Sequence, residues 1–428
     1  MNRTVSLLGA LSIGIGGMVG GGIFAVLGEA VSMAHSATPL AFLVAGIVAV
    51  LSAYSYSKLS VYFQSSGGTI VFIDNAFRHS LFSGSINFLL WLSYLVTISL
   101  YAVAFGSYAL TFFDNGSSLL LKHFFISLAI VMPGTINLIN ASLVSKSETL
   151  VVIIKLLLML LIIVVGFPYV DYQRLVPSSY GSSFSIVAAG MIIFVAYEGF
   201  ELIANASAEI KEPQKNLPRA FFGSVVFVII LYILIAIITV GAVDEHTLLV
   251  AKDYALAVAT KPALGQFGFT LVAIAALLAT FSAINATIFG NARLSYALSF
   301  DGELPKVDKD GVSNPKHNAM LTIGLSLLMA NFINLNAIAI IGSASFLLIF
   351  SVVNLSAYKL QDKIGGLKLI YLSAFIVSVF ALIILLMHTY SKDSFAVFIF
   401  LLFILLSISF ESIYGRIYRK KHCCDHKI

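Results

Sequence analysis

Charged residues are scarce in this chain: they make up 11% of its 428 residues, whereas hydrophobic residues make up 59%. A soluble globular protein carries about a quarter charged residues, so this composition excludes a protein surrounded by water and makes lipid its solvent. Cysteine is scarcer still. Cys423 and Cys424 are the only two and stand side by side after His422, which excludes a disulfide framework and favours a reduced tail over a lipidated or metal-binding one.

Long apolar runs take the place of charge. Runs of about 20 residues without strict alternation are transmembrane helices, because lipid offers the backbone no hydrogen bonds. The first run is too long for the core of a signal peptide and ends in no clear cleavage site, so we interpret it as a retained span. We predict an all-α membrane protein with about twelve spans, near residues 5–33, 38–62, 83–113, 121–141, 147–168, 183–208, 218–243, 262–299, 317–335, 337–360, 366–389 and 394–414.

The placement of lysine and arginine predicts the orientation. If both termini are cytoplasmic, eighteen of the 25 lysines and arginines fall in inside segments, and five fall outside: Lys122, Arg174, Lys252, Lys261 and Lys392. The positive-inside rule then predicts that both termini are in the cytoplasm, and we predict a multi-pass protein of the cell (inner) membrane. No loop is long enough to form a soluble domain, so the chain is one membrane unit.

The first span contains an unusual density of glycine. From Gly14 to Phe24, six of eleven residues are glycine, and each costs a helix interior roughly 1 kcal/mol relative to alanine. A packing seam needs only one or two small residues on one face, whereas these glycines occupy every face. We therefore favour an unwound segment that lines a cavity, because irregular backbone survives at mid-membrane depth only there.

A second irregular stretch lies in the sixth predicted span, where Glu198, Glu201 and Asn205 stand in apolar sequence. Intramembrane acids face protein or water rather than lipid. The two stretches are about 180 residues apart, as expected for two inverted five-helix repeats that each begin with a broken helix. We predict a transporter core over 1–361, with repeats at about 1–168 and 183–361, two additional helices over 362–414 and a cytoplasmic tail over 415–428.

Helix ends at the two breaks would offer both kinds of partial charge. Where the second half of the first helix begins, free N–H groups suit a carboxylate. Where the first halves of the first and sixth helices end, free carbonyls suit an ammonium group or a cation. Such a site fits a zwitterion, so the predicted substrates are amino acids or close analogues. The predicted contacts are Gly16, Gly17, Met18, Gly20, Gly21, Gly22, Phe194, Val195 and Tyr197.

At these residues the chain resembles the amino acid–polyamine–organocation transporter family. Residues 13–24 are similar to the opening signature of that family, and residues 194–219 are similar to its sixth helix and the loop that follows. Residues 66–69, after the second span, and residues 291–305, from the end of the eighth, carry further family patterns. The resemblance covers spans one to ten in order, and it implies a leucine-transporter-like fold and a secondary transporter of amino acids.

The resemblance gives Lys155, inside the fifth span, a specific meaning. Its position alone would allow the side chain to snorkel to the cytoplasmic surface. In relatives, a lysine at the matching position occupies the place of sodium and reaches a first-helix carbonyl and an eighth-helix hydroxyl. These contacts would be Gly16 (or Gly17) and Ser282 here, with protons as the coupling ion and sodium disfavoured. Exchangers of the family carry the same lysine, so exchange stays open.

The resemblance also assigns roles to residues of the sixth span. Glu198 matches a position that faces the substrate side chain in relatives. There it would favour cationic substrates, titrate with Lys155 or serve as a structural carboxylate. Glu201 matches an acid linked to proton effects in exchangers, with a structural role equally open. Many relatives carry a bulky aromatic gate at the position of Val195, so the gate passes here to Phe194 or the pocket is larger.

Two further features are less specific. Arg293 ends the eighth span and would close an intracellular gate with Asp301, unless it is a plain interfacial arginine. Tyr94, Tyr101 and Tyr108 form a stripe with seven-residue spacing on the third span, and such a stripe is more often packing than cavity lining.

These observations together predict proton-coupled uptake of amino acids by alternating access, with the substrate and the bilayer as partners and no nucleic acid, metal or other cofactor. An amino acid exchanger is the first alternative, and a permease for polyamines or cationic amino acids is the second. A channel would need a filter motif and a receptor a soluble signalling domain. A membrane enzyme would need a catalytic pattern such as His-Glu-x-x-His, Walker or Gly-x-Ser-x-Gly, and none is present. The oligomeric state stays open, and a monomer would suffice.

Overall fold

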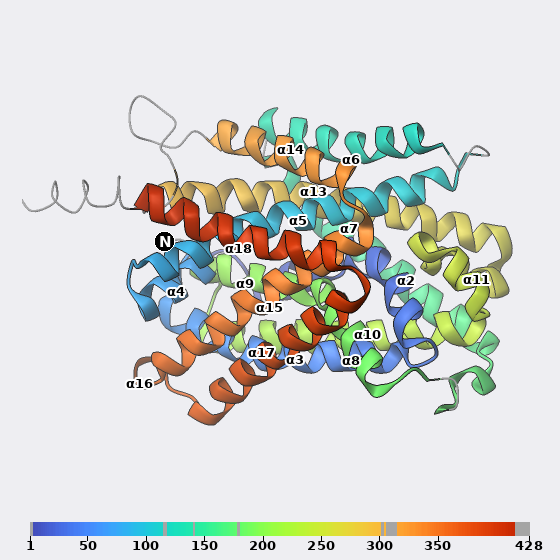
Figure 1. Cartoon of the computed structure of the whole chain (residues 1–428), viewed down its shortest axis with the longest axis horizontal. Helices are drawn as coiled ribbons and strands as arrows, with labels where there is room; N and C mark the ends of the chain where they lie inside the picture. Colours follow the sequence, from blue (N-terminus) through green and yellow to red (C-terminus); the bar gives the residue numbers. More distant parts are fainter. Residues whose placement is uncertain are drawn as a thin grey trace, which may run out of the picture.

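The chain forms helices and no strand over the residues that the computed structural model describes, which are 3–113, 118–139, 142–177, 180–300, 304 and 315–415. Figure 1 shows most of the long helices lying along the long axis of the molecule. The N-terminus, α4 (Thr69–Phe77) and α16 (Gln361–Ile364) lie at one end, and α11 (Glu245–Val250) lies at the other. The predicted all-α membrane fold is confirmed.

Ten segments of the described chain are long and apolar enough to cross a membrane, and the bent pair α1 and α2 makes an eleventh. The ninth predicted span, near 317–335, corresponds to α14 (Pro315–Phe332). This helix is not one of the ten, because the polar residues Lys316, His317 and Asn318 in its first turn lower the mean hydropathy of its 18 residues. The inverted symmetry of the two repeats and the division at residue 361 stay predictions. The ten are α3 (Thr38–Phe63), α5 (Leu81–Leu110), α6 (Leu119–Ile139), α7 (Ser142–Gly166), the segment Ser183–Asn205, α10 (Pro213–Ala242), α13 (Lys261–Phe300), α15 (Leu335–Lys359), α17 (Lys368–Lys392) and α18 (Ser394–Tyr414).

The start of α10 differs from the sequence prediction by five residues. The prediction placed it near residue 218, where the apolar run begins after a stretch of charged residues, proline and asparagine. In the structure, α10 begins at Pro213, with Pro218 inside the helix. Proline is well suited to the first position of a helix, where the missing N–H group would have no partner anyway.

The first span is broken as predicted. Helix α1 (Leu7–Met18) and helix α2 (Gly22–Ala34) meet at an angle of 45°. The reason for the glycines differs from the prediction, because none of those between Gly14 and Gly22 has a positive φ. A Cβ at each of them would instead press against a neighbouring element, such as Val152 of α7 at Gly16 and Ala283 of α13 at Gly20, both at 2.9 Å. The glycines give room for close packing on every face.

The sixth span changes helix type in its middle. Helix α8 (Ser183–Ile192) continues as a nine-residue 3-10 helix, η4 (Ile193–Glu201), followed by α9 (Leu202–Asn205). Runs of 3-10 helix longer than about four residues are uncommon, and such runs often mark functional hinges. Ser343 of α15 supports the change: its hydroxyl donates to the carbonyl of Ile192 at 2.5 Å and accepts from the amide of Val195 at 3.0 Å.

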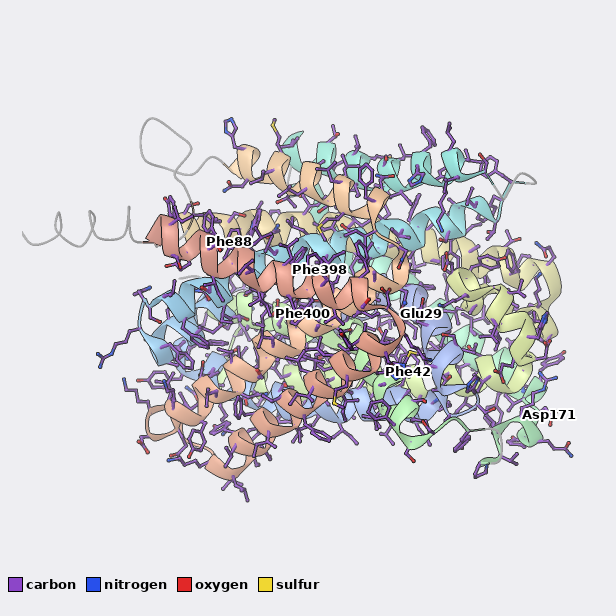
Figure 2. The ribbon with its side chains drawn as sticks, in the orientation of Figure 1. Glu29, Phe42, Phe88, Asp171, Phe398 and Phe400 are labelled. Atoms are coloured by element: carbon purple, nitrogen blue, oxygen red, sulfur yellow. The ribbon has the colours of Figure 1, made fainter. Side chains whose placement is uncertain are left out.

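The connection between α10 and α13 covers one end of α2. It contains α11, the 3-10 turn η6 (Lys252–Tyr254) and α12 (Ala255–Val258). Lys252 Nζ lies 2.7 Å from Oε2 of Glu29, a buried residue of α2 that is labelled in Figure 2. Asp253 accepts from Lys122 of α6 at 3.1 Å and from Ser107 of α5 at 3.0 Å. Polar contacts therefore fix η6 to three spans at this end.

The substitution Gly28→Ala tests how closely η6 approaches α2. The added Cβ would overlap the carbonyl oxygen of Lys252, so η6 must shift and the ion pair with Glu29 must weaken. We expect the unfolding free energy to fall by about 1–3 kcal/mol, measured as a lower melting temperature of the purified protein in detergent. Gly324→Ala on α14 is the matched control, because nothing lies within 4 Å of its added Cβ. Equal melting temperatures for the two variants would contradict the packing described here.

Candidate functional site

A cavity of about 30 Å³ lies where the two broken spans meet α5, α7 and α13. It has room for one or two water molecules. Six residues predicted from the sequence border it together: Gly16, Gly17, Lys155, Glu198, Glu201 and Ser282. The other lining residues are Tyr94, Tyr101, Gly199, Leu202, Ala283, Ala286 and Thr287.

Backbone contact between the broken spans forms one wall of the cavity. An added Cβ at Gly17 would lie 2.7 Å from the carbonyl oxygen of Gly199, and one at Gly199 would overlap the backbone of Gly17 and Met18. Any residue larger than glycine at these two positions would force α1 and η4 apart. The contact brings the end of α1 next to the acids of η4.

Lys155 is buried in the protein and does not snorkel to a surface. Its Nζ donates a hydrogen bond to the carbonyl oxygen of Gly16 at 2.9 Å, which is the contact predicted from the sequence. Gly16 belongs to the last turn of α1, where carbonyls lack helical partners and the helix dipole favours a cation. Ser282 of α13 borders the same cavity as Lys155. The lysine therefore connects α7 to the break in the first span.

The carboxylate of Glu201 is surrounded by hydroxyl donors. Tyr94 of α5 donates to Oε1 at 2.5 Å, and Tyr56 of α3 and Thr69 of α4 donate to Oε2 at 3.3 and 3.4 Å. Asn205 in turn donates to the hydroxyl of Tyr94 at 3.4 Å. Charge-assisted hydrogen bonds of this kind offset the cost of burying a carboxylate. Glu201 thereby joins three other elements to the sixth span.

Glu198 is also buried but has far fewer partners. Its Oε1 accepts from the Thr97 hydroxyl at 2.9 Å, whereas its Oε2 is buried without a hydrogen-bond partner among the described residues. Side chains three residues apart eclipse one another in a 3-10 helix. The 3-10 geometry of η4 therefore turns Glu198 and Glu201 to the same cavity.

Three predicted residues of this stretch do not border the cavity: Phe194 and Tyr197 belong to another row of the 3-10 helix, and Val195 lies one turn before Glu198 in the row of the acids. The ring of Phe194 packs on Phe350 with centroids 5.8 Å apart, and the Tyr197 hydroxyl donates to the carbonyl of Phe42 on α3 at 3.0 Å. Val195 is buried against Gly342. In this structure both side chains lie in the core between helices, and the two alternatives, a gate at Phe194 or a larger pocket at Val195, stay predictions.

The remaining residues of the first break do not border the cavity. Met18 offers its carbonyl to the Tyr232 hydroxyl at 2.6 Å, and Gly20 packs against Ala283. Gly21 lies against the ring of Tyr101 and Gly22 against Ala196. Of the carbonyls predicted near residues 194–197, that of Ala196 accepts from Tyr232 at 3.4 Å.

The predicted intracellular gate has one described member. Arg293 is exposed, and its guanidinium lies 5.1 Å from the ring centroid of Phe289 on the same helix. Asp301 lies outside the described residues, as does the tail with Cys423 and Cys424 beyond residue 415. The pairing of Arg293 with Asp301 therefore stays a prediction.

Sequence reasoning understated the role of tyrosine and threonine. Tyr94 and Tyr101 both border the cavity, whereas Tyr108 packs against Phe24 with ring centroids 6.0 Å apart. Their seven-residue spacing was visible, but such a stripe is more often packing than cavity lining. Tyr56 and Thr97 carried no signal that separates a cavity residue from ordinary packing.

Known proteins are similar to this sequence over most of its length. A family model described as amino acid permease matches residues 5–408. An uncharacterized protein of Methanocaldococcus jannaschii is 35% identical over 424 residues, which cover 98% of this chain and 97% of its own. Inner membrane transport protein YbaT of Escherichia coli is 34% identical over 370 residues, or 85% of each chain. Branched-chain amino acid permease BcaP of Lactococcus lactis is 25% identical over 399 residues, 85% of this chain and 83% of its own.

Two tyrosine-to-phenylalanine substitutions test whether the hydroxyl of Tyr94 stabilises the protein by donating to Glu201. Tyr94→Phe removes the closest donor to Glu201, and a buried acceptor left short of a donor costs about 1–3 kcal/mol. We expect a lower melting temperature in detergent. Tyr101→Phe is the matched control, because this tyrosine borders the same cavity but its hydroxyl makes no hydrogen bond within the described part of the chain. If both variants melt together, Tyr94 does not support Glu201.

Proposed function

Because the chain belongs to the amino acid permease family, we propose that it takes up amino acids by proton-coupled alternating access. One observation supports the proton coupling in this proposal. The ammonium group of Lys155 is bonded to the carbonyl of Gly16, inside a buried cavity and at the break of the first span. The family membership confirms the resemblance read from the sequence, and the multi-pass membrane character agrees with it.

The two ends of the first break would hold the backbone of the amino acid. Helix α2 begins at Gly22 with unpaired N–H groups and the positive end of its dipole, which suits the substrate carboxylate. Helix α1 ends at Met18 with its last carbonyls, which suit the ammonium group. The side chain of the substrate would then extend toward the face of η4 that carries Glu198 and Gly199.

The cavity has to enlarge before a substrate enters. Its volume of about 30 Å³ suits one or two water molecules, and even the smallest amino acid is several times larger than water. At the end of the molecule that holds α11, η6 is fixed to α2 through Glu29 and Lys252. Release of this contact would open a path on that side, and movement of α1 against α7 would open one on the other.

Lys155 would couple these movements to the proton. While protonated, its ammonium group holds α1 to α7 through Gly16 and occupies the position where a bound cation would otherwise neutralise helix carbonyls. Without its proton it could no longer donate a charge-assisted hydrogen bond, so α1 would be freer to move. The same ammonium group disfavours sodium in this place.

The proposed location is the cell membrane, with both termini inside. The Escherichia coli relative is named as an inner membrane transport protein. Basic residues lie near α11 and η6: Lys252 belongs to η6, Lys122 bonds to Asp253 of η6, and Arg174 borders a cavity together with Glu245 of α11. Lys261 begins α13, directly after the connection that contains α11 and η6. The far greater number of lysines and arginines predicted inside supports a cytoplasmic position for the opposite end, which holds the N-terminus.

Transport by purified protein in liposomes tests the proposal. We expect an inward proton gradient to raise the uptake of labelled amino acids several-fold over the same liposomes without a gradient. Lys155→Ala should abolish this stimulation, because no titratable ammonium group would remain to bond the carbonyl of Gly16. Lys392→Ala is the control, since that lysine is exposed at the end of α17 and should leave uptake unchanged.

The exchange alternative predicts a different result from the same liposomes. An exchanger would ignore the proton gradient and would need unlabelled amino acid inside. Uptake with that pattern would refute symport while leaving amino acid transport in place. Gradient-driven uptake that survives Lys155→Ala would remove the lysine from the mechanism.

A further inference from the structure

We propose that Glu198 selects the charge of the substrate, and that the cavity accepts amino acids whose side chain carries a positive charge. This inference rests on the proposed function, because it names a substrate class for the same site. Oε2 of Glu198 is buried, borders the cavity and has no hydrogen-bond partner within the described part of the chain.

A buried carboxylate oxygen without a donor is costly, so it persists where something else supplies the donor. Thr97 serves only the other oxygen, Oε1, at 2.9 Å. The cavity that Glu198 borders is a space that could admit a donor. The missing donor is therefore expected to come from the molecule that fills this cavity.

Glu201 does not compete for that donor. Tyr94, Tyr56 and Thr69 already donate to its two oxygens, and all three hydroxyls belong to buried side chains. The two acids of η4 thus differ in kind although they lie on the same face. Glu201 is held by the protein, whereas Glu198 has an oxygen left for a ligand.

The charges around the cavity indicate which ligand fits. Its titratable lining consists of Glu198, Glu201, Lys155, Tyr94 and Tyr101, with the ammonium group of Lys155 bonded to Gly16. With both carboxylates and the lysine ionised, the lining has one negative charge more than positive charges. A zwitterion adds no net charge and leaves this excess in place. An amino acid with an ammonium or guanidinium side chain cancels it, and charge balance is worth most in a buried site.

The arrangement also separates the two ends of such a substrate. The carboxylate and the α-ammonium group would be held at the break of the first span. Glu198 precedes Gly199, whose backbone touches Gly17 and Met18 at that break. A side chain that leaves the break along η4 meets the free oxygen of Glu198, so its charge would be recognised apart from the backbone of the amino acid.

Matched substrates test this inference on the reconstituted protein. Lysine and norleucine share the same carbon chain and differ by the terminal ammonium group; arginine and citrulline are a second matched pair. We expect wild-type protein to prefer lysine to norleucine by at least tenfold in competition against labelled lysine, with a similar preference for arginine over citrulline. Glu198→Gln keeps the shape of the side chain without its charge, and it should bring both ratios close to one.

Glu411→Gln is the control variant. Glu411 is a second buried carboxylate, on α18 and outside the cavity, so its substitution should leave the ratios unchanged. The wild-type ratios alone decide the substrate class even if Glu198→Gln does not fold. Uptake of norleucine without uptake of lysine would overturn the inference and leave amino acid transport standing. Absence of any amino acid uptake would instead overturn the proposed function. A tenfold preference that survives Glu198→Gln would contradict the role of Glu198, because another residue would then select the charge of the substrate.

Discussion

The contact between the backbones of Gly17 and Gly199 is the constraint on which the site depends. The two broken spans touch there without any side chain between them, and a Cβ at either position would meet backbone atoms of the other span. Because they touch, the carbonyl that Lys155 binds and the acids of η4 border one cavity. If α1 and η4 were separated by the width of a side chain, the lysine and the acids would belong to different surfaces. Lipid provides no water to satisfy backbone groups exposed by such a separation, so close contact is also what makes two breaks tolerable at this depth.

The irregular stretches of the first and sixth spans and the two acids could be predicted because each violates what a lipid-embedded helix normally tolerates, whereas the contact of Lys155 with Gly16 was implied by the resemblance to the transporter family. Six glycines in eleven residues, and carboxylates in apolar sequence, are visible without knowledge of any neighbour. The reason for the glycines was not visible. None of them has a positive φ, and they instead make room for Val152, Ala283, Tyr101 and the sixth span. Which element lies on which face of a helix depends on tertiary packing, and a single sequence does not contain that information.

The orientation of the sixth span could not be predicted either, because it depends on the helix type. A continuous α-helix would place residues 194, 197, 198 and 201 on one face. In a 3-10 helix, residues three apart eclipse, so Phe194, Tyr197 and Phe200 form one row, and Glu198 and Glu201 belong to another. The first row packs into the core against Phe350, Phe42 and Tyr56, and the acids face the cavity. Ser343 supports this geometry from a helix about 150 residues away in sequence, where no local pattern could reveal it.

The two acids also show how a membrane protein separates stability from function within one turn. Glu201 is buried with three hydroxyl donors from α3, α4 and α5, so its carboxylate joins these elements to the sixth span and contributes to the fold. Glu198 has a single donor, and its second oxygen destabilises the fold for as long as the cavity lacks a partner for it. Packing alone would favour an apolar residue at position 198, as it does at the buried Val195 one turn earlier. Under the proposed specificity for cationic amino acids, a ligand in the cavity would supply the partner that this carboxylate oxygen lacks, so the cost of burying it would become a preference for a positively charged ligand.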